Sequence, residues 1–274
     1  MRARSVFITM IAAVSLSSCG GERVTAPPVP PPPPTPVLLR DVEVSRLPSP
    51  YYHFEYDAKG RAKKASFASG FTMYNLKYDH DRIVEMRDST LGDRDRLVYA
   101  YDDAGRVATI KYVDEAEQVY AVVSFTYDGQ KLTHVERERK LADVFVIDKT
   151  TALSYYADGN LRVLTEHRPK VDGYQTESTI TDSYELYDDK INVDAFGLLH
   201  TEFFDHLILL PGVALQNGNP GRVTRTGDGD NYGVDYTYNY DDRNRPLTKT
   251  GEVTFSSGPL AGEKFQTLSK FSYY

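Results

Sequence analysis

The sequence predicts an all-β protein, an antiparallel meander of repeated hairpins with about 14 to 16 strands, curled into a barrel-like or rolled sheet with one inserted helix. Three observations predict this class. Apolar and polar residues alternate along many short segments, a Tyr-Asp turn ends most of them, and the Tyr-Asp pairs recur. The unit is clearest over 97–113, where an aromatic strand, the turn Asp102-Asp-Ala-Gly105 and a return strand follow one another.

The spacing of the Tyr-Asp pairs sets the size of the repeat. The pairs lie 22, 23 and 26 residues apart from Tyr56 to Tyr78, Tyr101 and Tyr127. A weaker copy follows at Tyr187, and the last clear one ends at Tyr240. This period matches two strands and two turns, so each repeat is one hairpin plus its connection. An open flat sheet of that many strands would expose its edges, which favours curling or closure.

The alternation within the strands predicts a sheet with one buried face and one solvent-exposed face. In the first copy Tyr52, Phe54 and Tyr56 fall on one side, and His53 and Glu55 fall on the other. The same aromatic or aliphatic alternation occurs at Tyr74/Leu76/Tyr78, Val123/Phe125/Tyr127 and Tyr236/Tyr238/Tyr240.

The turn residues have a structural explanation. An aspartate at the start of a turn accepts hydrogen bonds from backbone N–H groups two residues on, and Gly60, Gly105 and Gly159 allow the positive φ of a bulged hairpin. Asn244 stands where glycine would. Because these aspartates recur at every turn, we interpret them as structural and not catalytic.

One segment breaks the rhythm. Phe196 to Pro211 is dense in Leu and Phe with helix-like spacing, which predicts an inserted helix that covers one end of the aromatic layer. The alternative role is a lid or partner-docking helix, in which His200 and His206 would be the polar contacts.

The N-terminus predicts export and lipidation. Residues 1–18 combine a basic start with a short apolar run, and Leu16-Ser-Ser-Cys19 resembles the box of bacterial lipoprotein signals, which implies that Cys19 is acylated after cleavage. Residues 19–36 then form a proline-rich spacer able to extend some 30 to 50 Å. We therefore expect a single β-repeat domain over 37–274, tethered to a membrane of the bacterial cell envelope, with the outer membrane favoured and its periplasmic or surface side left open.

Charge and cysteine content narrow the function. Without residues 1–18 the chain has 30 Lys and Arg against 39 Asp and Glu, a net charge near −9, and no basic block stands out, which argues against a nucleic-acid partner. Cys19 is the only cysteine, so no thiol remains for a disulfide or a metal site.

Catalytic and metal motifs are weak. The loop 227–233 places Asp228 and Asp230 as a calcium loop would, but Tyr232 stands at the fifth position, so a polar turn is the better interpretation. The six histidines show no ligand spacing, and the pairs Glu115/Glu117 and Glu136/Glu138 are typical of solvated strand faces. We expect no cofactor, no metal and no catalytic residue.

The 21 tyrosines raise a carbohydrate-binding hypothesis, because sugar rings stack on aromatic faces. Most of them lie on the predicted core face. Those off the pattern are the candidate ligand contacts, namely Tyr51, Tyr112, Tyr174 and Tyr232.

The Tyr-Asp-x-x-Gly-Arg pattern, best at Tyr56 to Arg61 and Tyr101 to Arg106, resembles the YD repeats of Rhs and teneurin proteins, whose hairpins coil into a β-shell. With the lipobox, the proline spacer and the Leu-rich insertion, the chain is similar to Bacteroidota lipoproteins grouped as a domain of unknown function with a porin-like fold. That resemblance implies a barrel-like meander and supplies no activity.

We therefore expect a non-enzymatic, lipid-anchored envelope protein that acts as a scaffold or binding module for an envelope protein or a glycan. The alternative is a glycan or small-ligand binding lipoprotein that uses the mouth of an open barrel, and an envelope hydrolase ranks third. A membrane-spanning barrel is disfavoured, because charges such as Lys63 and Lys64 fall on both faces of the return strands.

Overall fold

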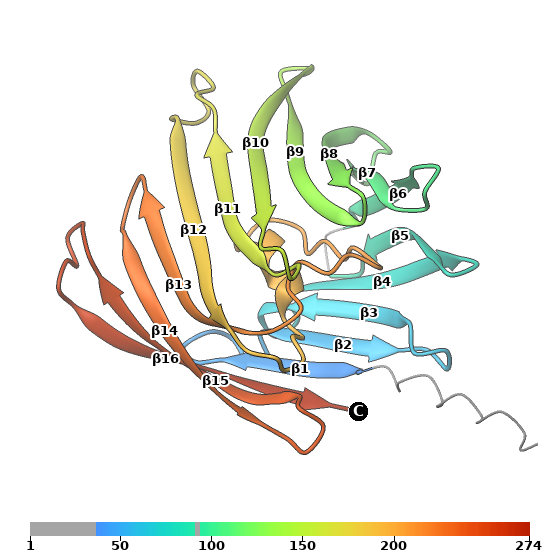
Figure 1. Cartoon of the computed structure of the whole chain (residues 1–274). Coiled ribbons are helices and arrows are strands. Elements are labelled where there is room, and N and C mark those ends of the chain that lie inside the picture. The colour runs from blue at the N-terminus through green and yellow to red at the C-terminus, as the bar shows by residue number, and fades with distance from the viewer. Residues whose placement is uncertain (1–36, 91–93) are drawn as a thin grey trace, which may run out of the picture. The chain divides into compact units, whose positions relative to one another are not determined.

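The computed structural model describes residues 37–90 and 94–274, and within them one closed barrel of sixteen antiparallel strands (Figure 1). Each strand pairs with its neighbours in sequence, and the pairing of β1 with β16 closes the sheet. The first eight strands are β1 (Leu39–Val44), β2 (Tyr52–Tyr56), β3 (Ala62–Phe67), β4 (Thr72–Asp79), β5 (Arg82–Asp88), β6 (Arg96–Tyr101), β7 (Val107–Val113) and β8 (Val119–Asp128). The last eight are β9 (Lys131–Leu141), β10 (Val144–Tyr155), β11 (Leu161–Arg168), β12 (Ser178–Tyr187), β13 (Pro220–Gly227), β14 (Tyr232–Tyr240), β15 (Pro246–Phe255) and β16 (Lys264–Tyr273). The all-β class, the barrel-like meander and the strand number are confirmed, and of the curled and closed forms that the sequence left open the sheet adopts the closed one.

The Tyr-Asp hairpins are bulged, as their glycines predict. The ladder between β6 and β7 shifts by one residue at Tyr101, where Gly105 has a φ of 79°. In the last hairpin Asn244 replaces glycine with a φ of 60°. The carboxylate of Asp102 accepts a hydrogen bond of 2.9 Å from the backbone N–H of Arg106, which is the structural role expected for the turn aspartates.

Antiparallel order places the two kinds of connection at opposite ends of the barrel. We call the end with the Tyr-Asp turns the turn rim; it is formed by residues 57–61, 79–82, 102–106, 128–131, 156–160 and 241–245. The segment 188–219, which joins β12 to β13, also starts and ends there, and we call it the insertion. We call the opposite end the return rim; it is formed by residues 45–51, 68–71, 89–90 and 94–95, 114–118, 142–143, 169–177, 228–231 and 256–263.

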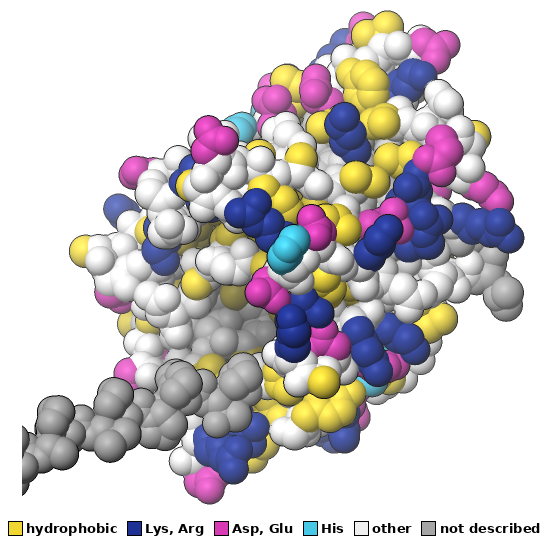
Figure 2. Space-filling view, turned by 90° about the vertical axis from the view of Figure 1, so that its right-hand side faces the viewer, with side chains coloured by type: hydrophobic (Ala, Val, Ile, Leu, Met, Phe, Trp, Pro, Cys, Tyr) yellow, Lys and Arg dark blue, Asp and Glu magenta, His cyan; other side chains and the backbone are white. Residues whose placement is uncertain are grey.

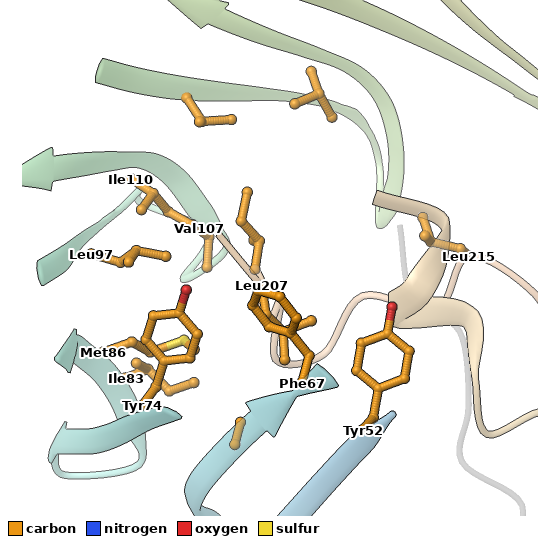
Figure 3. Close-up of a cluster of buried hydrophobic side chains, with 14 of the residues drawn as sticks. Tyr52, Phe67, Tyr74, Ile83, Met86, Leu97, Val107, Ile110, Leu207 and Leu215 are labelled. Atoms are coloured by element: carbon orange, nitrogen blue, oxygen red, sulfur yellow. The ribbon is translucent and has the colours of Figure 1, made fainter. Parts of the chain in front are cut away.

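The insertion fills part of the barrel interior (Figure 1). Leu207, Ile208 and Leu215 are buried in the main core cluster, where Leu207 lies among side chains of the early strands such as Phe67 and Val107 (Figure 3). The segment was expected to bury its apolar side chains over one end of the aromatic layer, and in the structure it buries them inside the barrel.

The expected helix over Phe196 to Pro211 is much shorter in the structure. Only Ala195–Leu199 is helical, as a five-residue 3-10 turn, η2, and the rest of the insertion follows an irregular path of turns. The physical reason is that some of its apolar side chains point into the core and others point into solvent. Leu207 points into the core while Phe204 is 87% exposed, and one face of a helix cannot do both.

The outer face of the barrel carries charged side chains. Cross-strand ion pairs there include Lys64 with Glu55 and Lys264 with Glu252, and on the side of the molecule in Figure 2 charged side chains of both signs are interspersed with apolar ones. In the described part of the chain, no helix has the length and apolar character needed to cross a membrane.

Candidate ligand site

A cavity remains inside the barrel, between the insertion and the wall formed by β12 to β16 and β1. Its volume is about 280 Å³. It exists because the interior is divided: the main core cluster packs the insertion against the early strands, and Val234, Val253 and Phe255 form a separate small cluster. We call this space the lumen cavity; six of its lining residues are Asp182, Asp194, Arg225, Tyr232, Tyr236 and Lys249.

The first functional group in the lumen cavity is a guanidinium–carboxylate pair. Asp182 on β12 lies directly opposite Arg225 on β13, and the two side chains form hydrogen bonds of 2.8 and 2.6 Å. Hydrogen bonding to Asp182 raises the pKa of the Arg225 guanidinium above its ordinary value, although burial opposes this. The guanidinium carbon also lies 5.4 Å from the ring centre of Tyr232.

The second group is an ammonium–carboxylate pair that joins the wall to the insertion. Nζ of Lys249 on β15 lies 3.3 Å from Oδ2 of Asp194. Burial lowers the pKa of the Lys249 amine, but the charge of Asp194, the neighbouring Tyr236 and the hydrogen bond to Asp194 together outweigh burial, so the net shift is upward and the amine stays protonated. The same Nζ lies 4.5 Å from the ring centre of Tyr236.

Glycine at one wall position shapes the site. Gly251 on β15 is paired directly with Tyr236, and a Cβ there would lie 2.8 Å from the ring of Tyr236 and 2.9 Å from a methyl carbon of Val234. Because glycine has no side chain, the Tyr236 ring can lie close against the wall.

Unused hydroxyl groups complete the lumen cavity. The side chains of Tyr184, Tyr236 and Ser269 line the lumen cavity. None of their hydroxyls hydrogen-bonds to another described residue. Burial raises the pKa of Tyr184 well above its ordinary value, so this hydroxyl keeps its proton and can donate as well as accept.

A smaller space adjoins the lumen cavity. It measures about 130 Å³ and shares Asp182 and Arg225 as a common wall. Its other polar lining includes Glu166 and Arg168, which are paired at 2.7 Å. The Asp182–Arg225 pair therefore lies at the boundary between two adjoining spaces.

A buried ionic cluster clamps the insertion to the opposite wall. Arg137 on β9 contacts Asp148 at 2.7 Å and Asp205 of the insertion at 2.6 Å, while Lys149 lies 3.2 Å from the same Asp205 oxygen. Burial raises the pKa of Asp205, but the charges of Lys149 and Arg137 outweigh it and hold that pKa below its ordinary value. Asp205 is therefore ionised, and the clamp ties this part of the insertion to β9 and β10.

The sequence-predicted tyrosines do not all converge. Tyr232 lines the lumen cavity. Tyr51 packs edge-on against Tyr52, Tyr112 is buried in the main cluster, and Tyr174 is exposed in the 169–177 connection.

The two predicted histidines lie in the packed part of the insertion. Nδ1 of His200 is 3.0 Å from the hydroxyl of Tyr52, a side chain that lines the lumen cavity. His206 hydrogen-bonds to the hydroxyls of Tyr74 and Tyr120 and packs against the ring of Tyr112 at 4.7 Å. Tyr112 and His206 are thus brought together, whereas His200 reaches the cavity only through Tyr52.

The main functional residues of the cavity were missed by the sequence prediction. Asp182 and Arg225 occupy inward positions of their strands, and a charge on the face that otherwise alternates as core is the signal that could have found them. Tyr184 and Tyr236 were assigned to the core because they follow the alternation.

Other predicted features have these positions. Cys19 and the segments 1–18 and 19–36 lie outside the described residues. Glu136 and Glu138 alternate with the buried Arg137 on β9 and so lie on the other face of that strand. Asp228 accepts a hydrogen bond from the backbone N–H of Thr179. Over residues 37–90 and 94–274, no group of three or more His, Cys, Asp or Glu is arranged to hold a metal ion.

Comparison with known proteins identifies the fold. A porin-like protein from Bacteroides uniformis is 16% identical with a TM-score of 0.54, covering 81% of this chain and 89% of that chain. A porin-like protein from Bacteroides vulgatus is 14% identical with a TM-score of 0.56, covering 86% of this chain and 99% of that chain. At this identity the likeness shows a shared porin-like fold. The sequence matches no protein-family model and no curated protein.

Proposed function

We propose that this chain is a non-enzymatic, lipid-anchored protein of the bacterial cell envelope that binds a small ligand inside its barrel. The observation that carries the proposal is the lumen cavity of about 280 Å³ with two internal ion pairs. Small-ligand sites are concave and equipped with a few convergent polar groups, and this space has both properties.

The envelope location rests on the N-terminal sequence. Leu16-Ser-Ser-Cys19 supports acylation of Cys19, and the proline-rich spacer supports a domain held at a distance from the membrane. The exposed cross-strand ion pairs on the outer face, such as Lys64 with Glu55, support a barrel wall that contacts water, because a lipid-facing wall carries an apolar band. In this proposal the membrane partner is engaged through the lipid alone.

A binding role is favoured over a purely structural one by how the interior is filled. The insertion is long enough to occupy the lumen, yet the Arg137, Lys149 and Asp205 clamp ties its middle part to β9 and β10. Buried ionic groups cost free energy unless they are fully paired, so an apolar filling would be the simpler way to stabilise the fold. The use of an ionic clamp in place of an apolar filling therefore supports a barrel whose interior is kept open for a ligand.

A scaffold role remains the second candidate because of one exposed aromatic group. Phe71 of the return rim contacts Phe203 at 5.1 Å and Phe204 at 6.4 Å between ring centres. Phe204 is the most exposed large hydrophobic side chain among the described residues. Such a group is typical of a docking point for another protein.

Calorimetric titration of the intact chain tests the binding proposal. The probes are N-acetylglucosamine, glucosamine, glucuronate, glycylglycine, phenol and benzoate, which cover neutral, cationic, anionic and zwitterionic small molecules. Ser269→Phe places a ring inside the lumen cavity without removing a hydrogen bond of that side chain. Ser124→Phe introduces the same ring on β8, on the face of that strand that points away from the barrel interior, and is the control.

We expect at least one probe to bind the wild-type chain and the Ser124→Phe variant, and to lose at least about tenfold in affinity in Ser269→Phe, since the ring removes the space. Binding that is equal in all three proteins, or no binding of any probe, would overturn the proposal.

A further inference from the structure

The charge balance of the lumen cavity limits the kind of ligand that it accepts. Its two cations are each already paired with a carboxylate, Arg225 with Asp182 and Lys249 with Asp194. Apart from tyrosines, no other ionisable side chain lines it within the described residues, so its net charge is zero. A charged ligand would leave one charge uncompensated in a desolvated space or would have to break an existing pair.

The adjoining space repeats this balance. There Glu166 is paired with Arg168, beside the shared Asp182–Arg225 pair. A ligand that extends from one space into the other therefore meets no unpaired charge at any point along the shared wall.

The hydrogen-bonding groups in the lumen cavity suit hydroxyls. Tyr184, Tyr236 and Ser269 offer hydroxyls that make no hydrogen bond with the described protein, and each can both donate and accept. Lys249 has one carboxylate contact for its three N–H donors. A ligand hydroxyl also both donates and accepts, so it can satisfy these groups without a change in protonation.

Apolar side chains also line the lumen cavity. Val42, Val223 and Val234 contribute methyl groups, and the Tyr232 ring contributes an aromatic surface. The volume lies at the small end of the range of ligand pockets, which runs from about 300 to 1,000 Å³. The space is thus sized for one small ring with an apolar C–H face and a hydroxylated edge.

From the paired charges, the free hydroxyls and the volume of the lumen cavity, we infer that its ligand is a neutral saccharide, one sugar ring in the main space with a small substituent in the adjoining one. This inference rests on the proposed binding function and adds the class of ligand. Recognition comes from hydroxyl contacts to the tyrosines and to the two ion pairs.

Three sugars of one ring size and different charge test the inference by calorimetry on the intact chain. N-acetylglucosamine is neutral, glucosamine is cationic and glucuronate is anionic at pH 7. We expect the neutral sugar to bind the wild-type chain at least about tenfold more tightly than either charged one, because only the charged sugars disturb a paired charge.

Two variants that each remove one member of the Lys249–Asp194 pair test whether the charge of the lumen cavity sets the preferred charge of its ligand. Asp194→Asn removes the partner of Lys249, and because the Asp194 side chain makes no capping hydrogen bond to η2, the local turn keeps its contacts. This variant is expected to shift the preference toward glucuronate. Lys249→Met leaves Asp194 unpaired and is expected to shift it toward glucosamine.

The outcomes separate this inference from the proposed function. If a charged sugar or a non-sugar probe binds the wild-type chain as tightly as N-acetylglucosamine, and Ser269→Phe abolishes that binding, the saccharide inference is overturned while the cavity remains a ligand site. If the preference of the two variants stays that of the wild type, the charge argument is overturned. Absence of any binding sensitive to Ser269→Phe overturns both.

Discussion

At the scale of single residues, the repeated tyrosines join neighbouring hairpins around the turn rim. Tyr101 donates a hydrogen bond of 2.8 Å to the backbone carbonyl of Ile83 on the preceding strand pair. The same kind of bond to a backbone carbonyl recurs from Tyr56 to Leu39, Tyr78 to Ala62, Tyr127 to Val107, Tyr155 to Leu132, Tyr187 to Leu161, Tyr238 to Pro220 and Tyr273 to Pro246.

Arginines of the turns form a second contact between adjacent repeats, with tyrosine rings. The guanidinium carbon of Arg106 lies 4.7 Å from the ring centre of Tyr127 in the next repeat, and Arg61 lies 4.4 Å from that of Tyr78. The Tyr-Asp-x-x-Gly-Arg pattern therefore needs no catalytic explanation: its aspartate and glycine form the turn, and its tyrosine and arginine join that turn to adjacent repeats.

Removal of one tyrosine hydroxyl tests this account. Tyr101→Phe loses the bond to Ile83 and leaves the ring in place, so we expect the free energy of unfolding to fall by about 0.5–1.5 kcal/mol. Tyr174→Phe is the matched control, because Tyr174 is exposed and its hydroxyl hydrogen-bonds to no described residue. Equal stability of the two variants in chemical denaturation would contradict the linking role.

At the scale of elements, the insertion is a structural part of the barrel core and also presents side chains to solvent. Leu207 is completely buried, and two residues before it Asp205 joins the ionic clamp. Between these contacts and η2, Phe203 and Phe204 project at the return rim beside Phe71. The irregular path follows from these opposed demands.

Two truncations within the insertion test this division. Leu207→Ala is expected to cost about 2 to 5 kcal/mol of stability, because it leaves a cavity in packed surroundings. Phe204→Ala is expected to change stability by no more than about 0.5 kcal/mol, because the ring is exposed. Thermal unfolding measures both, and a large loss for Phe204→Ala or a negligible one for Leu207→Ala would show that the segment packs differently.

The elements also show where sequence-based prediction succeeds and where it stops. Alternation and turn chemistry are local, so the strands around Tyr52 and Tyr101 and the left-handed turn at Asn244 were predicted from neighbouring residues alone. The helix over 196–211 was wrong beyond its first turn, because its Leu and Phe spacing reflects contacts with distant strands.

The candidate site depends on such distant contacts even more. Tyr236 follows the core alternation, so the local pattern predicts that its side chain faces inward. The pattern does not predict whether other side chains fill the space in front of it. That depends on where the clamp of Arg137 and Asp205 holds the insertion, across more than sixty residues of sequence. Inward charges such as Arg225 were the available clue.

At the scale of the whole barrel, an asymmetric filling of the lumen explains the cavity. The insertion packs against the early strands, a separate small cluster forms at β14 and β15, and the lumen cavity lies between them. A closed sheet of sixteen strands encloses more interior than its wall side chains alone fill, so the position of the insertion decides how much space is left.

The most direct test of this central claim is methyl NMR of the intact chain labelled at valine, recorded during titration with N-acetylglucosamine. The account predicts that the methyl signals of Val42, Val223 and Val234, which line the lumen cavity, shift in a saturable way, while those of Val98 and Val122, which do not line it, stay in place. Shifts confined to Val98 and Val122, or no shift at any valine, would contradict a site for a neutral saccharide in the lumen cavity.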